Sequence, residues 1–236
     1  LRILTRKKII LDAGWPSLDS TKIRSNSKSR LMKSYFLDLI CFHLASLVLL
    51  ESEAQISRCQ KSFLIRRKKL KVVYTGFNEI AFIQECKSGD RVSVEVGEVI
   101  EQSNDLTFVL FRGLDNAEAG LENLVKAAKD LPSVFFCLAS PNTKIQPTTR
   151  NLVVIKNWLN ANDMKALYGR ANFVLGQLGD LPRNAWTIAH KVFEAGYFGK
   201  ALISSQSFAL EEVFTEGRDM LFCSSSQGLS ELIAKL

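Results

Sequence analysis

The sequence predicts an α/β protein in which helices cover both faces of a Rossmann-like parallel sheet. Short apolar runs rich in β-branched residues alternate with helix-length segments along most of the 236 residues. These runs are apolar throughout instead of alternating with polar residues, as expected for strands that are buried on both faces. The composition, 47% hydrophobic and 23% charged, is that of a globular protein and excludes a disordered, coiled-coil or collagen-like chain.

The first third of the chain predicts a small strand and helix alternation. In order, we expect strand 8–11, helix 31–45, strand 47–50, helix 52–62 and strand 71–74. Residues 19–30 are rich in Ser, Lys and Arg and predict a solvated loop or an irregular helix start. Residues 85–104 are polar and weakly periodic, and therefore predict a linker or irregular insertion.

From residue 105 onward the alternation is regular. The predicted strands are 107–111, 134–139, 152–155, 173–175, 201–204 and 220–223, and the predicted helices are 119–131, 161–170, 187–197, 208–214 and 229–236. Ligands of open parallel sheets bind in the loops beyond the carboxyl ends of the strands. We therefore expect the functional residues in the loops after Phe111, Ile155, Leu175 and Ser204.

The net charge of +7 is unevenly distributed. Residues 1–75 hold 16 Lys and Arg against 5 Asp and Glu, whereas residues 76–236 hold 15 against 19. The basic run at 66–69 has two interpretations, a solvated connection or a contact with anionic lipid headgroups. We expect no nucleic-acid partner, because no aromatic stacking pattern accompanies the basic residues.

Cysteine usage and apolar segments predict the compartment. The five cysteines form no CxxC pair and the chain has two histidines, so neither a disulfide framework nor a metal site is expected. The apolar stretch 36–50 is too short for a membrane span, and no secretory signal is visible. We expect a cytoplasmic protein, with peripheral contact at the inner face of the membrane as an option for the basic 1–75 region.

The predicted helix 187–197 has the features of an anion site. Its N-terminus, near Thr187, offers unpaired N–H groups and the positive end of the helix dipole. His190 and Lys191 lie in this first turn, where cations gain nothing from the helix and favour a bound anion such as a nucleotide-sugar diphosphate. Glu194 shares their face and could accept hydrogen bonds from ribose hydroxyls. The alternative is an ordinary surface pair between Lys191 and Glu194.

Two loops supply further candidates. Arg112 and Gly113 end a predicted strand, where glycine permits a close approach of a phosphate and arginine can bind it bidentately. The alternative is an arginine that merely caps a strand end. In the loop 176–186, Arg183 is a candidate second phosphate ligand and Asp180 a candidate contact to a donor sugar.

Three groups of segments carry a resemblance to a known family. They are Val72–Glu79 with Phe82, Phe111–Gly113 with Glu118–Leu121, and Leu175–Gln177 with Thr187–Ala195 and Gly199–Ala201. In this order and spacing they resemble the family 4 glycosyltransferases (glycosyl transferases group 1), which have the two-lobed GT-B fold. The resemblance implies a retaining, hexosyltransferase-like transfer of a sugar from a nucleotide-diphosphate donor to an unidentified glycan, lipid or other acceptor, with no tightly bound cofactor or metal.

The resemblance also implies a set of donor-binding residues. They are Arg112, Gly113, Gly120, Arg183, Thr187, His190, Lys191 and Glu194. Departures from the family pattern favour a second hypothesis, a non-catalytic nucleotide-binding or scaffold module. Trp186 stands where many members have a first glutamate, and Leu114 and Ala119 replace a basic pair.

The resemblance divides the chain into parts of a larger protein. Residues 1–84 resemble the end of the acceptor-side lobe, 85–104 a linker, and 105–236 the donor lobe without its last helices. We therefore expect a fragment of a glycosyltransferase that is truncated at both ends. The full-length parent would be the enzyme, and this chain alone would bind a nucleotide weakly and show no transfer.

Overall fold

The computed structural model describes residues 7–88, 90–223 and 226–236. The chain forms two compact units. Unit 1 contains the residues up to Thr75 together with 185–188 and 207–213, and unit 2 contains 76–184, 189–206 and 214–236.

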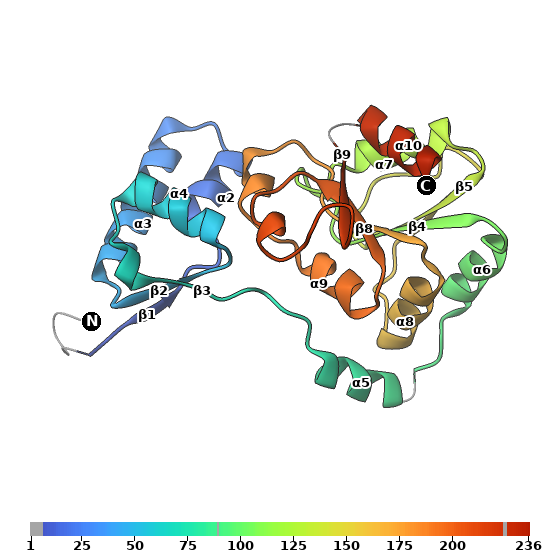
Figure 1. Cartoon of the computed structure of the whole chain (residues 1–236), viewed down its shortest axis with the longest axis horizontal. Helices are drawn as coiled ribbons and strands as arrows, with labels where there is room; N and C mark the ends of the chain where they lie inside the picture. The colour runs from blue at the N-terminus through green and yellow to red at the C-terminus, as the bar shows by residue number, and fades with distance from the viewer. Residues whose placement is uncertain (1–6, 89, 224–225) are drawn as a thin grey trace. The chain divides into compact units, whose positions relative to one another are not determined.

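Unit 1 is built on a parallel sheet of order β1-β2-β3 (Figure 1). Its strands are β1 (Ile10–Asp12), β2 (Leu47–Leu50) and β3 (Leu70–Val72), and its helices are α2 (Ser17–Arg24), α3 (Lys28–Leu44), α4 (Glu53–Phe63) and the 3₁₀ turns η1 (Arg67–Lys69) and η3 (Leu210–Glu212). Apolar side chains of β2 and α4, among them Val48, Leu50 and Ile56, form its core with Phe42 of α3.

Helix α2 corrects the prediction of a loop or irregular start over 19–30. Its first turn is capped by a residue that lies far along the sequence: the buried carboxylate of Asp38 accepts hydrogen bonds from the backbone N–H groups of Ser17 (3.0 Å) and Leu18 (2.8 Å). A carboxylate at this end of a helix satisfies orphan donors and complements the helix dipole. The local sequence holds no sign of this cap.

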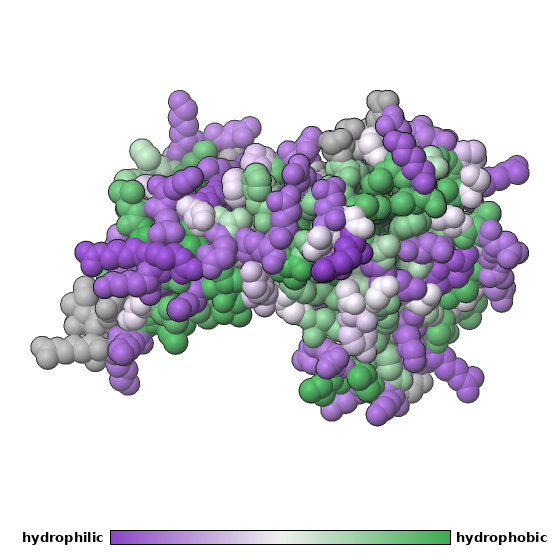
Figure 2. Space-filling view, viewed as in Figure 1, coloured by the Kyte–Doolittle hydropathy of each residue, from purple (hydrophilic) through white to green (hydrophobic). Residues whose placement is uncertain are grey.

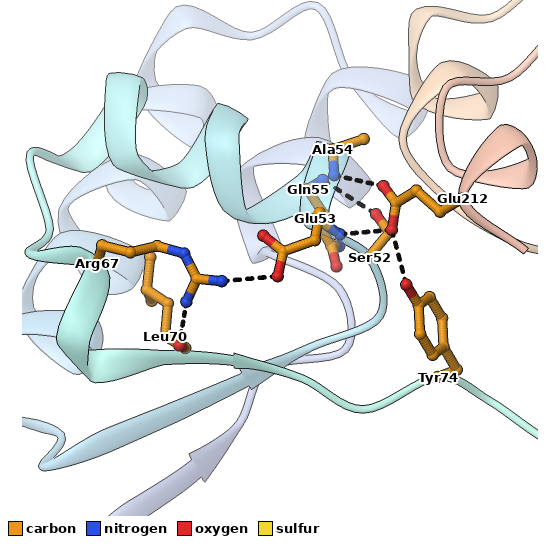
Figure 3. A network of polar contacts seen from close by, with 8 residues as sticks. All are labelled: Ser52, Glu53, Ala54, Gln55, Arg67, Leu70, Tyr74 and Glu212. Atoms are coloured by element: carbon orange, nitrogen blue, oxygen red, sulfur yellow. Dashed lines mark hydrogen bonds and ion pairs between the residues drawn. The ribbon is translucent and has the colours of Figure 1, made fainter.

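The N-terminus of α4 is held by a second distant carboxylate (Figure 3). Ser52 is the N-cap and accepts from the backbone N–H of Gln55 at 2.9 Å. Glu212 accepts from the backbone N–H groups of Glu53 (2.8 Å) and Ala54 (2.6 Å). The hydroxyl of Tyr74 donates to the same carboxylate at 3.1 Å. Segment 207–213 thereby becomes an integral part of unit 1.

Unit 2 is built on a six-stranded parallel sheet of order β6-β5-β4-β7-β8-β9. The strands are β4 (Thr107–Arg112), β5 (Val134–Ala139), β6 (Leu152–Ile155), β7 (Phe173–Leu175), β8 (Ala201–Ser205) and β9 (Met220–Cys223). From β4 the chain adds β5 and then β6 toward one edge of the sheet, and from β7 it adds β8 and then β9 toward the other edge. The boundary between β4 and β7 is therefore the switch point at which doubly wound sheets bind their ligands.

Helices cover both faces of this sheet, as predicted (Figure 1). They are α6 (Val94–Gln102), α7 (Leu121–Asp130), α8 (Ala161–Arg170), α9 (His190–Tyr197) and α10 (Ser226–Lys235), and α5 (Glu79–Lys87) packs against α8. Val109 and Phe111 of β4 pack with α7 and α10 in one core, and Phe108 on the opposite face lies under the guanidinium of Arg170 at the end of α8. In the described part of the chain, no helix is long and apolar enough to cross a membrane.

Two further predicted segments differ from the structure. Residues 85–104 are largely helical, because α6 buries Val96 and Val99 and because Asp163 of α8 accepts the backbone N–H of Ser93, the α6 N-cap, at 2.7 Å. The segment 208–214 forms only the single 3₁₀ turn η3 in place of a helix.

Two glycines let the loops beyond β4 and β7 pack together. Gly120 is buried with φ +61°, and a Cβ on it would lie 2.4 Å from the backbone nitrogen of Gly179. A Cβ on Gly179 would lie 2.4 Å from the carbonyl oxygen of Ala117. Side chains at either position would collide with backbone, so the close approach requires glycine.

Gly120→Ala should lower the free energy of unfolding by about 3 kcal/mol or more, because the methyl group adds a backbone clash to a left-handed conformation. Gly97→Ala is the matched control, since Gly97 lies inside α6 with nothing within 4 Å of an added Cβ. It should stabilise the protein by about 0.5–1 kcal/mol. Urea unfolding of the three proteins measures both values, and equal effects would contradict this account of Gly120.

Candidate functional site

The candidate site lies in unit 2 at the switch point between β4 and β7. Arg112 and Gly113 come from the end of β4, and Gly176 directly follows β7. His190 and Lys191 begin α9, the helix between β7 and β8. The structure therefore brings together the residues that the sequence predicts from three separate segments.

The carboxylate of Glu194 is the centre of this cluster. It is 2% exposed and accepts hydrogen bonds from three side chains. Arg112 Nη1 approaches Oε1 at 2.5 Å, His190 Nδ1 lies 2.9 Å from the same oxygen, and the hydroxyl of Tyr168 donates to Oε2 at 2.7 Å. These contacts join the end of β4 to α8 and α9, so Glu194 is not the exposed partner of a surface Lys–Glu pair.

The contacts around Glu194 shift the protonation equilibria of the cluster. Burial by itself would raise the pKa of Glu194, but the hydrogen bond with His190, the charge of Arg112 and the hydroxyl of Tyr168 together lower that pKa to about 2. The hydrogen bond to Glu194 raises the pKa of His190 in turn. Burial raises the pKa of Tyr168 well above its usual range, and this hydroxyl remains a donor.

Lys191 reaches from α9 to the strand ends. Its ammonium donates to the carbonyl oxygen of Gly176 at 3.3 Å and lies 3.5 Å from the ring centroid of Phe111, a cation–π geometry. Burial lowers the pKa of Lys191 to about 7, which Glu194 partly opposes. An anion that binds beside this ammonium would favour its charged form.

Gly113 leaves room for the ammonium of Lys191. It has φ +151°, and a Cβ on it would lie 3.2 Å from Lys191 Nζ. Gly176 is similarly restricted, since a Cβ there would lie 2.6 Å from the hydroxyl oxygen of Ser204. These glycines keep the ends of β4, β7 and β8 close together around the lysine.

Four predicted residues are placed differently from the expectation. Arg183 is buried and pairs with Glu118 at 2.8 Å, which uses it to fasten a loop instead of offering it to a phosphate. Gly120 is buried against Gly179, as described above. Thr187 precedes α9, which begins at His190, and belongs to unit 1. Asp180 is exposed, and its negative charge adds to the effect of burial in raising the pKa of the Cys223 thiol.

Two aromatic residues beside the cluster are not predicted from the sequence. Tyr168 lies on the buried face of α8, where its position in the sequence pattern is that of an ordinary core residue. Trp158 follows β6 and is 79% exposed. It lines a cavity of about 220 Å³ beside Arg112 and Gly113, with Leu114, Ala139, Pro141, Asn157 and Leu159. A tryptophan three residues beyond a predicted strand end is the signal in the sequence that identifies it.

The donor set does not include a metal-binding cluster in the described ranges 7–88, 90–223 and 226–236: no three His, Cys, Asp or Glu residues there are arranged to hold an ion. Around the carboxylate of Glu194 and the hydroxyl of Tyr168, the polar groups of the site are a guanidinium, an ammonium, an imidazole and backbone N–H groups. Such a set binds anions.

Glu194→Gln should lower the free energy of unfolding at pH 7 by about 2–4 kcal/mol, because the amide leaves Arg112 without its counter-charge. The pKa of this carboxyl drops from 4.5 in the unfolded chain to about 2 in the native protein. The wild type therefore loses this stabilisation as the pH falls from about 5 to about 2, and the difference from the variant should shrink over that interval.

Urea unfolding at several pH values tests this expectation. Glu122→Gln, which alters an exposed carboxylate in the first turn of α7, is the control and should change stability by less than about 0.5 kcal/mol. A difference between wild type and Glu194→Gln that stays constant down to acid pH would contradict the assigned contacts.

Comparison with solved structures identifies the fold. HepE from Anabaena in complex with UDP-glucose has a TM-score of 0.66 at 16% identity over 99% of this chain and 64% of that chain. Sucrose-phosphate synthase from Thermosynechococcus elongatus has a TM-score of 0.70 at 13% identity, covering 94% and 57%. An α,α-trehalose-phosphate synthase from Burkholderia xenovorans in complex with glucose-6-phosphate has a TM-score of 0.71 at 12% identity, covering 100% and 61%.

At these identities the likeness shows the fold, which is the Rossmann-like α/β arrangement of the GT-B glycosyltransferases. The chain spans 57–64% of the length of these three structures. A search of curated proteins finds no relative. A family model described as glycosyl transferase-like matches residues 117–236, about half of the chain. The chain therefore belongs to the glycosyl transferase-like family.

Proposed function

We propose that this chain provides the donor-binding site of a family 4 glycosyltransferase, which transfers a sugar from a nucleotide-diphosphate donor. The observation that carries the proposal is the convergence of Arg112, Lys191 and the N-terminus of α9 at the switch point of a parallel sheet. This is the position at which doubly wound sheets bind nucleotides. The positive groups match the charge of a diphosphate.

The cluster would stabilise the departing diphosphate. Breaking a glycosidic bond to a nucleotide places negative charge on the leaving phosphate, and fixed cations lower the energy of that charge. Arg112 is held in place by Glu194, and Lys191 by Gly176 and Phe111. Because these groups are positioned before the donor arrives, little reorganisation is needed at the moment of reaction.

Glu194 would act in two ways. Its main effect is to orient Arg112 and His190 through the hydrogen bonds described above. A carboxylate has about four acceptor positions, and the three contacts leave one position on Oε2. A ribose hydroxyl could donate there, the role that the family resemblance implies for this residue.

The cavity beside Gly113 would take the base of the nucleotide. Its volume of about 220 Å³ and its apolar lining suit a planar ring, and Trp158 offers an exposed face for stacking. Stacking of a base on an aromatic side chain contributes about 1–3 kcal/mol. Arg112 adjoins both this cavity and the α9 N-terminus, so one ligand could span base and diphosphate positions.

The finer features of the reaction belong to the same proposal. Residues 1–84 would be the end of the acceptor-side lobe and 105–236 the donor lobe, and transfer would retain the anomeric configuration without a tightly bound metal. The acceptor would be a glycan, lipid or other molecule, reached from the cytoplasmic side with peripheral contact of the basic 1–75 region with the membrane. Activity would require the full-length parent.

A second candidate function is nucleotide binding without transfer. Trp186, Leu114 and Ala119 favour it, because they replace a carboxylate and two cations of the family pattern. The exposed position of Asp180 adds no substitute carboxylate to the contacts of the cluster. Hydrolysis or transfer of UDP-glucose by the full-length parent would exclude this candidate, whereas binding alone would support it.

Binding of UDP-glucose, measured by calorimetry, tests the donor site. Arg112→Ala and Lys191→Met should each weaken binding at least tenfold, because each removes a charge from the diphosphate position. Lys165→Ala, an exposed lysine of α8, is the matched control and should leave affinity unchanged. Absence of binding by the wild-type chain and its full-length parent would contradict the proposed function.

The affinity for UDP-glucose should also fall as the pH rises from about 6 to about 8, because Lys191 has a pKa of about 7 and loses its charge over this range. The diphosphate of UDP-glucose is a diester and does not titrate in that interval. Lys191→Met should abolish the pH dependence. A slope that persists in Lys191→Met and disappears in His190→Gln would assign the dependence to His190 instead.

Trp158→Ala should weaken UDP-glucose binding about tenfold or more through the loss of base stacking. Trp15→Ala, at an exposed tryptophan of unit 1, is the control. If Trp158→Ala and the wild type bind UDP-glucose equally well, the base does not stack in this cavity. The assignment of the diphosphate position would be unaffected.

A further inference from the structure

Helix α3 of unit 1 presents an apolar face to solvent. Five large hydrophobic side chains are 43–62% exposed: Met32, Phe36, Leu37, Ile40 and Leu44. Four of them recur every fourth residue and form one stripe along the helix, about 18 Å long from first to last. Figure 2 shows hydrophobic residues at the surface of unit 1 beside strongly hydrophilic ones.

Within the described residues, this stripe lies outside the core of unit 1. The opposite face of α3 carries the buried residues Asp38 and Phe42, with Tyr35 and Leu39 packed against the core of unit 1. The helix is therefore already anchored by one side. A second apolar side of this length is a recognised mark of an interaction surface.

The charged residues around the stripe are positive. Lys28, Arg30 and Lys33 lie on α3 itself, all exposed, and within the described residues none of them forms an ion pair. The five acidic residues of the region up to Thr75 are bound internally: Asp12, Asp19, Asp38, Glu51 and Glu53. Unit 1 also contains Glu211 and Glu212, but its lysines and arginines outnumber its carboxylates.

A basic cavity lies at the carboxyl end of α3. It has a volume of about 710 Å³ and is lined by Lys8, His43, Ser46, Leu64, Ile65, Arg66, Lys68 and Lys69. Its position is defined by Lys69, whose ammonium donates to the carbonyl oxygen of His43 at 2.8 Å near the end of α3. Leu64 at its rim is 82% exposed with φ +53°, so this edge also offers an apolar side chain.

We propose that α3 and the basic cavity dock unit 1 onto an anionic lipid surface. The stripe from Met32 to Leu44 inserts at the boundary of headgroups and acyl chains, as amphipathic helices do. The cations of α3 and of the cavity contact lipid phosphates. This inference deepens the membrane contact in the proposed function by naming the surface, and it does not depend on the donor site.

Charge decides between a membrane and a second copy of the chain as the occupant. Two copies that met through α3 would bring two positively charged surfaces together, and juxtaposed like charges oppose association. An anionic bilayer complements the same cations, and each basic residue near such a surface strengthens binding about fivefold.

Flotation with vesicles of phosphatidylcholine, with and without about a third phosphatidylglycerol, tests the proposal. The wild-type chain should bind only the anionic vesicles, and more weakly as salt increases. Phe36→Ser with Ile40→Ser should reduce binding at least tenfold, because two large apolar groups are lost from the inserted stripe. Lys33→Gln and Lys68→Gln should each reduce it about fivefold.

The matched control introduces two serines at still more exposed apolar positions of unit 2, Ile80→Ser with Val94→Ser, whose residues are 68% and 78% exposed. It should bind vesicles like the wild type. All variants should keep the thermal unfolding and UDP-glucose affinity of the wild type, which separates this test from that of the donor site.

Three results would overturn the proposal. They are equal binding to neutral and anionic vesicles, unchanged binding of Phe36→Ser with Ile40→Ser, or an absence of vesicle binding. If light scattering then shows a dimer that this double variant dissociates, the occupant of the stripe is a second copy instead.

Discussion

The buried carboxylate of Glu194 is the interaction on which the arrangement of the site depends. A charge removed from water is costly unless other groups replace its hydration. Arg112, His190 and Tyr168 supply those groups from β4, α9 and α8. The carboxylate therefore holds three elements in register, and Lys191, three residues before Glu194 on α9, donates to the carbonyl oxygen of Gly176 at the end of β7.

Most strands of unit 2 and its helices α7, α8, α9 and α10 could be predicted from the sequence. The bounds of β5, β6, β7, β9 and α8 are those expected from continuous apolar runs and flanking turn residues. The convergence of Arg112, Gly113, His190, Lys191 and Glu194 was also predictable. Parallel strand order places the loops after β4 and β7 at one edge of the sheet, and this topological rule does not require knowledge of side-chain contacts.

The remaining differences arise from contacts between residues distant in sequence. Asp38 caps α2, Asp163 holds the start of α6, and Glu118 pairs with Arg183 across 65 residues. Each partner is a common charged residue, and its local sequence contains no sign of its use. Tyr168 was missed for a related reason, since its ring is a core residue and only its hydroxyl reaches Glu194. Pattern analysis detects burial, but it does not detect which buried polar atoms meet.

The capping of α4 by Glu212 links the structure of unit 1 to the order in which the chain is made. The hydroxyl of Ser52 donates to the carbonyl oxygen of Trp186, 134 residues later. Glu212 accepts from the first N–H groups of the same helix, as Figure 3 shows. Although β1, β2 and β3 are synthesised first, unit 1 cannot complete these contacts until residue 213 has left the ribosome. The N-terminal unit is therefore completed only after most of unit 2 has been synthesised. A gene cut after its third strand would encode an α4 that keeps its Ser52 N-cap but lacks the carboxylate of Glu212.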